Sequence, residues 1–182
     1  YTGVEFGLSK IQPRSPAQTL QRRYGDCKDQ AGLLIAMLRE LDIEAYAALL
    51  NVSNRMDVVV NTPGLNAFDH VIVYVPAQDE LSEIWIDMTS PYSVFGNLPR
   101  SSQNRLALVA SPKTDSLKRT PNSTSQDNRR VQTYHYQLSA DAPTHVVVNS
   151  TSIGTIADDY KATYASAPKA DLLENAEQNF KE

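Results

Sequence analysis

Residues 27–41 are the most apolar helix-like stretch of the chain, and they constrain its fold more than any other segment. The run "CKDQAGLLIAMLREL" places apolar side chains at helical spacing, namely Ala31, Leu34, Ile35, Leu38 and Leu41. Leu33 and Met37 widen the apolar arc, which predicts a helix covered on most of its sides. The rest of the chain must therefore supply the surfaces that bury this helix.

Helix-start signals stand before this stretch. Ser15 is a suitable N-cap, and Gln18 completes a capping box with it, so we expect a short helix that stops at Gly25. Asp26 can then cap a second helix that begins at Cys27. The two helices are predicted to be separated by only a few residues.

Strand-like segments follow the second helix. They cover residues 43–52, 68–76, 82–89 and 106–110, and the short link "AQDEL" predicts a hairpin between the second and the third. Residues 111–130 are polar and poor in large apolar groups, so we interpret them as a linker. Beyond them, a second hairpin pattern and a helical stretch broken near Pro168 complete the chain.

Composition limits the function classes. The chain has 182 residues and a net charge of -4, with no basic stripe, so a nucleic-acid partner is not expected. No apolar run approaches the length of a membrane span. The single cysteine excludes an internal disulfide and a zinc cluster built from several thiols.

That cysteine, Cys27, lies in the first turn of the apolar helix and shares its inward face with Ala31. Unpaired backbone N–H groups and the positive end of the helix dipole favour a thiolate at this position. Buried free cysteines are, however, usually inert packing groups. From the helix position alone, a structural role and a nucleophilic role both remain open.

A base for this thiol is suggested by the predicted hairpin. A turn centred between Gln78 and Asp79 would place His70 directly opposite Asp87. Such a pair has Cβ atoms about 4.5–5.5 Å apart on one face of the sheet. A slip of two residues would leave a diagonal pair, and a slip of one would put the side chains on opposite faces. Taken singly, His70 could also be an ordinary strand histidine, and Asp87 could be an aspartate that ends a strand and starts a turn.

Three segments, "YGDCKDQAGLLIAMLRELDIEAYAALLN", "FDHVIVYVP" and "WIDMT", resemble the transglutaminase-like superfamily. They are closest to its bacterial branch, in which a β-rich domain precedes the core. The resemblance implies an α+β, papain-like core over residues 1–110, with a central Cys-bearing helix packed on an antiparallel sheet. The linker 111–130 and the start of a C-terminal β-rich domain, 131–182, would follow. Residues 1–7 would be the last strand of the preceding domain.

The resemblance and the chemistry of acyl transfer together suggest roles for single residues. Cys27, His70 and Asp87 fill the positions of a catalytic triad. The backbone N–H of Cys27 would donate to the oxyanion, and Gln12 is a weaker second donor. Tyr24 and Trp85 would line a substrate groove, although Trp85 is expected mainly to pack. No metal-ligand spacing involves the remaining histidines, His135 and His145.

The expected function is thiol-dependent acyl transfer on a peptide or protein amide through a thioester intermediate. Hydrolysis by a peptidase or amidase is favoured; the alternatives are a protein-glutamine crosslinking transglutaminase and a non-catalytic cell-envelope binding module. We expect no cofactor and no metal. The expected partners are a peptide or protein substrate and the flanking β-rich domains of a longer chain. The resemblance suggests a periplasmic or cell-envelope location.

Overall fold

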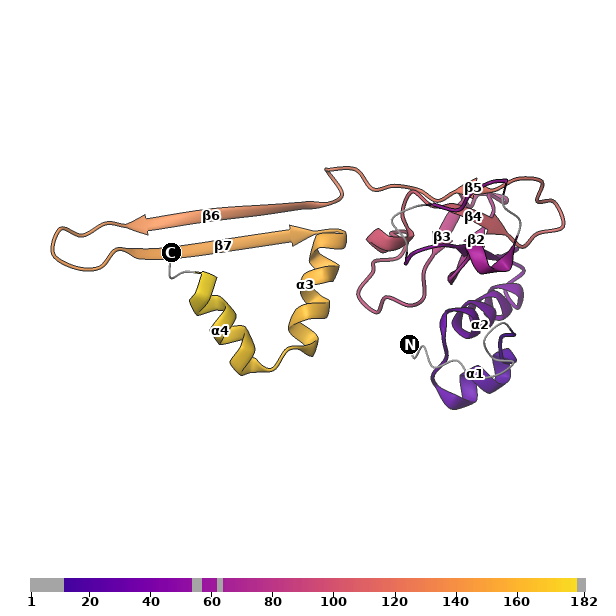
Figure 1. The fold of residues 1–182 in the computed structure, drawn as a ribbon, viewed down its shortest axis with the longest axis horizontal. Helices are drawn as coiled ribbons and strands as arrows, with labels where there is room; N and C mark the ends of the chain where they lie inside the picture. Colours follow the sequence, from indigo (N-terminus) through magenta and orange to yellow (C-terminus); the bar gives the residue numbers. More distant parts are fainter. Residues whose placement is uncertain (1–11, 54–56, 62–63, 180–182) are drawn as a thin grey trace. The chain divides into compact units, whose positions relative to one another are not determined.

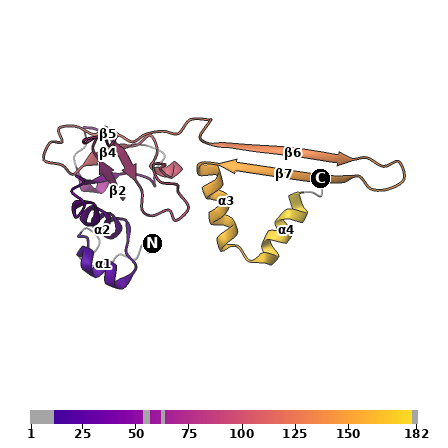
Figure 2. The same ribbon diagram turned by 180° about the vertical axis from the view of Figure 1, so that it is seen from behind.

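The computed structural model describes residues 12–53, 57–61 and 64–179, and the chain divides into two compact units between Asn122 and Ser123. The first unit combines two helices with a five-stranded sheet, and the second combines a two-stranded hairpin with two further helices. Figures 1 and 2 show the elements of both units from opposite sides. The strand expected over residues 1–7 lies outside the described residues.

Both helices of the first unit begin where their caps predict. Helix α1 (Pro16–Arg22) has Ser15 as N-cap, with the complete capping box to Gln18. It ends earlier than the predicted stop at Gly25, because Arg23 already adopts the left-handed conformation with φ 57°. Helix α2 (Cys27–Arg39) begins after Asp26, whose Oδ1 accepts a hydrogen bond from the Asp29 backbone N–H at 3.1 Å.

A buried ion pair fixes the chain before α1 to the first turn of α2. Asp29 is 1 % exposed, and the backbone N–H and the Nη1 group of Arg14 each donate to its carboxylate at 2.7 Å. Gly25 lies directly against this carboxylate, since a Cβ added there would stand 2.6 Å from the Asp29 Cβ. Only glycine therefore allows the chain to pass this close and then enter α2 at Cys27.

The sheet of the first unit is antiparallel throughout, with the strand order β3-β2-β1-β4-β5. Its strands are β1 (Tyr46–Leu50), β2 (His70–Val75), β3 (Ile84–Ile86), β4 (Leu106–Val109) and β5 (Lys118–Arg119). Ala31 and Ile35 of α2 pack with Val73 and Val75 of β2 in one buried cluster. Alternate residues of β2 belong to a second cluster, which includes Leu98 from the loop after β3. Apolar side chains therefore pack against both faces of β2.

Helix α2 is covered on most of its sides, since only Met37 and Arg39 of its residues are exposed, but the expectation that Met37 and Leu41 belong to its apolar arc was wrong. Ala31 and Ile35 are buried and Leu34 and Leu38 are partly buried, but Met37 is 56 % exposed. Leu41 lies beyond the end of the helix and is 69 % exposed. Helix α2 is packed by the sheet and by α1, and Met37 lies outside these contacts.

The predicted register of the β2–β3 hairpin was also wrong, by two residues. Tyr74 pairs with Trp85, and the turn is closed by a bridge between Gln78 and Leu81. The turn is therefore centred one position later than expected, with Asp79 in the left-handed conformation at φ 50°. Because a slip of two residues preserves the alternation of faces, the side chains expected to meet still share one face of the sheet.

Part of the predicted linker, residues 111–130, belongs to the sheet. Strand β5 lies within it and pairs with β4, Leu106 facing Arg119 and Ala107 facing Lys118. Thr120, which follows β5, is 2 % exposed. The first unit thus extends beyond residue 110, and the polar composition of the segment reflects an edge strand with loops on either side.

The second unit contains β6 (Arg129–Gln137), β7 (His145–Ile153), α3 (Thr155–Ser166) and α4 (Lys169–Asn179). Strands β6 and β7 form the predicted hairpin, and the two helices separate at Pro168. His135 and His145 are exposed on this hairpin.

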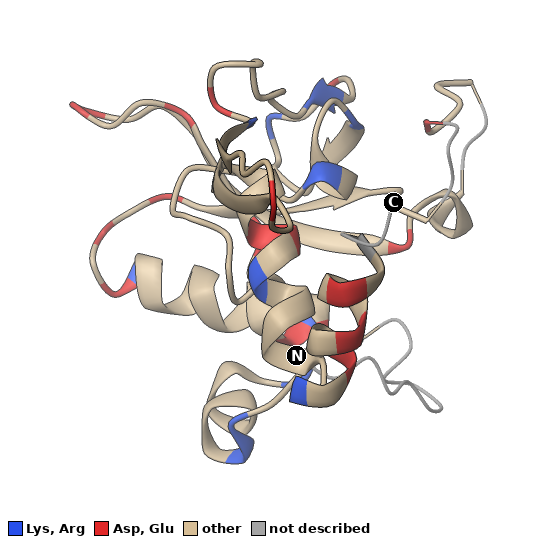
Figure 3. Cartoon of the chain, turned by 90° about the vertical axis from the view of Figure 1, so that its left-hand side faces the viewer, with Lys and Arg blue, Asp and Glu red and all other residues tan. Residues whose placement is uncertain are grey.

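Figure 3 marks the positions of Lys and Arg in blue and those of Asp and Glu in red, and both kinds occur on helices as well as on loops. Within the described ranges, no helix is long and apolar enough to cross a membrane.

We predict opposite effects of alanine at two glycines. Gly25→Ala should lower the free energy of unfolding by about 1–3 kcal/mol, because the new Cβ would overlap Asp29 and approach Thr19 Cγ2 to 3.3 Å. The matched control is Gly32→Ala, in the middle of α2, where no atom lies within 4 Å of the new Cβ. This change should raise the free energy of unfolding by up to about 1 kcal/mol. Urea unfolding of both variants measures these changes. Equal stability of the two would contradict the close approach at Gly25.

Candidate active site

Three side chains from separate elements meet at one end of the sheet. Cys27 is the first residue of α2, His70 is the first residue of β2, and Asp87 directly follows β3. Since β2 and β3 are antiparallel, the start of one strand lies beside the end of the other. The side chains are buried, with 7 %, 8 % and 7 % of their residue surfaces exposed, so the hydrogen bonds among them are shielded from water.

His70 lies between the thiol and the carboxylate. Its Nε2 atom is 2.9 Å from Asp87 Oδ2, and the Cys27 side chain lies close enough to help raise the pKa of the ring. Because Nε2 contacts the carboxylate, Nδ1 is the ring nitrogen left for the sulfur. The diagonal placement of His70 and Asp87, two residues out of direct register, is still within reach of the long imidazole side chain.

The pKa values of His70 and Asp87 are both shifted from their ordinary values. Burial alone would lower the pKa of His70, but hydrogen bonds and charge interactions with Asp87 and Cys27 outweigh it and raise that pKa to about 9. Burial would likewise raise the pKa of Asp87, but the hydrogen bond and charge of His70, aided by Thr89, lower it to about 2. A charged imidazolium beside a charged carboxylate is therefore favoured over a wide pH range.

Asp87 accepts hydrogen bonds on both oxygens. Oδ1 accepts from the Thr89 backbone N–H at 2.9 Å and from Thr89 Oγ1 at 2.6 Å. Oδ2 accepts from Ser102 Oγ at 2.7 Å in addition to His70. Sequence analysis assigned no role to Thr89 or Ser102. The Asp-x-Thr spacing is a local signal for the first contact, whereas nothing near Ser102 indicates the second.

The start of β2 is anchored to the end of β1, which fixes the position of His70. Asp69 accepts hydrogen bonds from the backbone N–H groups of Val52 at 2.8 Å and Ser53 at 3.1 Å. The Asn51 side chain donates to the Ala67 carbonyl at 3.0 Å. These contacts hold the residues on both sides of the β1–β2 connection in place around the histidine.

The remaining predicted site residues lie in different surroundings. Trp85 is 3 % exposed and packs on Tyr74, with ring centroids 4.6 Å apart, so it is a core residue and does not form an exposed groove wall. Tyr24 is 46 % exposed, and the Arg22 guanidinium lies over its ring at 4.4 Å. Gln12 is exposed ahead of α1, and its role as an oxyanion donor stays a prediction.

Charged groups near the thiol helix are paired. Lys28 forms an ion pair with Asp26, the residue that caps α2. In the part of the chain that the structure describes, no group of three or more His, Cys, Asp or Glu side chains is placed to hold a metal ion.

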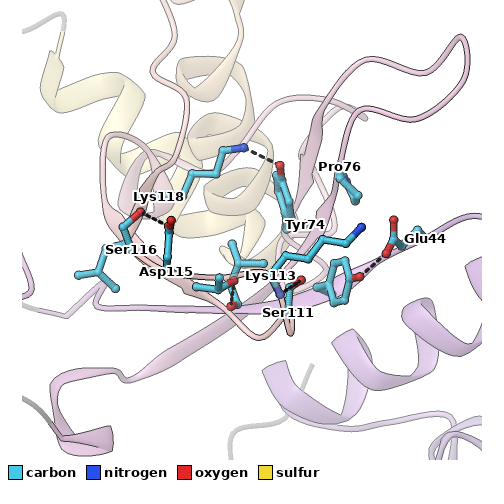
Figure 4. Close-up of a pocket in the computed structure, with 12 residues that line it drawn as sticks. Glu44, Tyr74, Pro76, Ser111, Lys113, Asp115, Ser116 and Lys118 are labelled. Atoms are coloured by element: carbon cyan, nitrogen blue, oxygen red, sulfur yellow. Dashed lines mark hydrogen bonds between the residues drawn. The ribbon is translucent and has the colours of Figure 1, made fainter.

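A pocket of about 400 Å³ lies elsewhere in the first unit (Figure 4). It is lined by the end of β2 and by the β4–β5 connection, and includes Tyr74, Pro76 and Lys118. Lys118 donates to the Tyr74 hydroxyl at 2.5 Å and pairs with Glu83. None of the three side chains that meet at the start of β2 lines this pocket, so the cavity is separate from the candidate active site.

The His70–Asp87 pair predicts a specific pH dependence of stability. The raised pKa of His70 gives a stabilisation that is complete below its ordinary value of 6.5 and is lost as the pH rises through about 9. The lowered pKa of Asp87 gives a second stabilisation. It is present above pH 3.8, the ordinary pKa of the group, and is lost as the pH falls towards about 2. The stability difference between the wild type and Asp87→Asn should therefore be largest between about pH 4 and 6.5 and shrink towards pH 9. Urea unfolding across this range measures it, and a constant difference would contradict the pairing.

A scan against protein-family models matches residues 5–89 to the transglutaminase-like superfamily. The matched range contains Cys27, His70 and Asp87 together with α1, α2 and strands β1 to β3. Neither the curated proteins nor the solved structures gave a match. The mixed helix-and-sheet architecture, with α2 packed on an antiparallel sheet, agrees with the family match. The match over residues 5–89 thus supports the resemblance of this part of the chain to the transglutaminase-like superfamily.

Proposed function

We propose that the protein transfers the acyl group of a peptide or protein amide to its own Cys27 and then to water, as a thiol-dependent peptidase or amidase. The observation that supports this most is the buried meeting of three side chains, in which His70 contacts Asp87 at 2.9 Å and interacts with Cys27. A thiol, an imidazole and a carboxylate in this order are the groups that nucleophilic acyl transfer needs. The match to the superfamily is compatible with such an activity.

In the first half of the proposed reaction, Cys27 attacks as a thiolate, and His70, as an imidazolium, holds the proton that the thiol has given up. The sulfur attacks the amide carbonyl carbon, and the tetrahedral intermediate collapses as the C–N bond breaks. The protonated His70 gives its proton to the leaving amine. The products of this half are a free amine and a thioester between the substrate acyl group and Cys27.

In the second half, water attacks the thioester carbonyl while His70 accepts a proton from it. The C–S bond breaks, the carboxylic acid leaves, and the thiol is restored with its original proton count. Asp87 stays ionised throughout and orients the ring of His70 by accepting from Nε2. Its low pKa is the physical reason for this assignment.

The proposed oxyanion donor is the backbone N–H of Cys27. As the first residue of α2, Cys27 has one of the N–H groups that the helix itself cannot pair. Within the described part of the chain, no hydrogen bond from this N–H is recorded, so the donor is available to a substrate oxygen. The helix dipole adds favourable potential for a developing negative charge at the same place.

The acceptor of the acyl group determines the name of the activity. Water gives hydrolysis, and a lysine amine would give crosslinking between proteins through the same thioester. We favour water because it reaches any open site, whereas an amine needs its own binding channel. A binding module without catalysis is the alternative in which Cys27 takes no covalent part.

The experiment is to incubate the protein with glutamine-containing peptides, with and without an added primary amine. We expect ammonia or peptide cleavage without amine incorporation, because water resolves the thioester. Amine incorporation into the peptide would replace hydrolysis by the crosslinking reaction. Mass spectrometry of both peptide and protein distinguishes the two products and detects an acyl adduct on Cys27.

Variants of the triad provide the controls. Cys27→Ala should abolish turnover and the adduct, and His70→Ala should lower the rate by about 10²–10⁴-fold, since it removes the proton carrier. An exposed histidine from the second unit, changed as His135→Ala, should leave the rate unchanged. If wild-type protein shows neither turnover nor a Cys27 adduct, and iodoacetamide does not modify Cys27 faster than in His70→Ala, a non-catalytic binding role is favoured instead.

A further inference from the structure

We infer that Ser102 is a positioning residue of the candidate active site, holding Asp87 in the orientation in which its carboxylate contacts His70. This inference deepens the proposed function and rests on it. It concerns a residue outside the range that matches the family, because that range ends at residue 89.

The contact of Ser102 with Asp87 is short and fully buried. Ser102 is 0 % exposed, and its Oγ donates to Asp87 Oδ2 at 2.7 Å. The same oxygen faces His70 Nε2 at 2.9 Å. A hydroxyl that donates to a buried carboxylate forms a charge-assisted hydrogen bond, the stronger kind. Ser102 thus acts on the atom that orients the imidazole.

Ser102 and Thr89 hold different oxygens of the carboxylate. Both Thr89 donors contact Oδ1, and on their own they would leave the group free to pivot about that atom. Ser102 fixes the second oxygen. Two anchoring points define the plane of the carboxylate, and that plane determines how directly Oδ2 faces the imidazole ring.

Ser102 is itself held in place by Thr120, the residue after β5. Thr120 Oγ1 donates to the Ser102 carbonyl at 2.7 Å and accepts from the Arg105 backbone N–H at 2.9 Å. The Thr120 backbone N–H donates to the Arg105 carbonyl at 2.9 Å. The sheet edge formed by β5 therefore supports the serine, which in turn supports Asp87.

The protonation of His70 is a suitable measure of this support. Among the described residues, the titratable groups that act on His70 are Cys27, Asp87 and, through its charge, Asp69. Ser102 does not titrate and is not adjacent to His70 in sequence. A change in the titration of His70 upon altering Ser102 must therefore act through the carboxylate.

The test is a pH titration of the His70 ring by NMR in the full chain, with the resonance assigned by its loss in His70→Ala. We compare the wild type, Ser102→Ala and Ser101→Ala. Ser101 is the exposed neighbour of Ser102 in the short 3-10 helix Arg100–Ser102, which lies in the loop before β4, and it provides the matched control. In Ser102→Ala the midpoint should fall by about one pH unit, a tenfold change in the protonation equilibrium, and Ser101→Ala should match the wild type.

An unchanged midpoint in Ser102→Ala would overturn the inference, leaving Ser102 a structural residue. A raised midpoint would overturn it too, because it would mean that Ser102 competes with His70 for Oδ2. The rate of Cys27 alkylation by iodoacetamide should fall with the midpoint. Both readouts are independent of turnover, so inactivity of the wild type on amides would contradict the proposed function without affecting this result.

A second pair of variants covers the case in which Ser102→Ala does not fold. Thr120→Val removes the hydroxyl that holds the Ser102 carbonyl while keeping the shape of the side chain, and Thr120→Ser keeps the hydroxyl. Thr120→Val should lower the His70 midpoint by a smaller amount than Ser102→Ala, and Thr120→Ser should restore it. Equal midpoints in the two Thr120 variants would contradict the support from β5.

Discussion

The carboxylate of Asp87 is the group on which the organisation of the candidate active site depends. A buried charge is unfavourable unless hydrogen bonds and an opposite charge compensate for its lost hydration. Asp87 receives this compensation from His70, from both donors of Thr89 and from Ser102. Because these donors come from different parts of the chain, satisfying one carboxylate also fixes β2, the end of β3 and the loop before β4 relative to one another.

The thiol end of the site depends on a second buried carboxylate. Asp29 is tied to Arg14 and stands against Gly25, so the chain ahead of α1 is joined to the first turn of α2. The pKa of Asp29 is lowered because its hydrogen bonds to Arg14 outweigh the effect of burial. This pairing determines where α2 begins, and Cys27 is its first residue. Two buried aspartates thus locate the two halves of the triad.

Local signals in the sequence were sufficient for some features and insufficient for others. The caps Ser15 and Asp26 marked the helix starts correctly, because capping involves residues only three apart. The hairpin register was misplaced because no glycine or asparagine marks the turn, which instead uses Asp79 in a left-handed conformation. The contact between Ser102 and Asp87 could not be foreseen, since it joins a loop to a strand end and no local pattern encodes it.

The placement of β5 has a consequence for defining the smallest self-sufficient part of the chain. A fragment excised at the end of the family match, residue 89, would retain the sulfur, the imidazole and the carboxylate. It would lose the Ser102 hydroxyl and leave His70 as the remaining donor to Asp87 Oδ2. An excision that preserves every donor to Asp87, together with the strand that holds Ser102, falls after Thr120, at the boundary between Asn122 and Ser123.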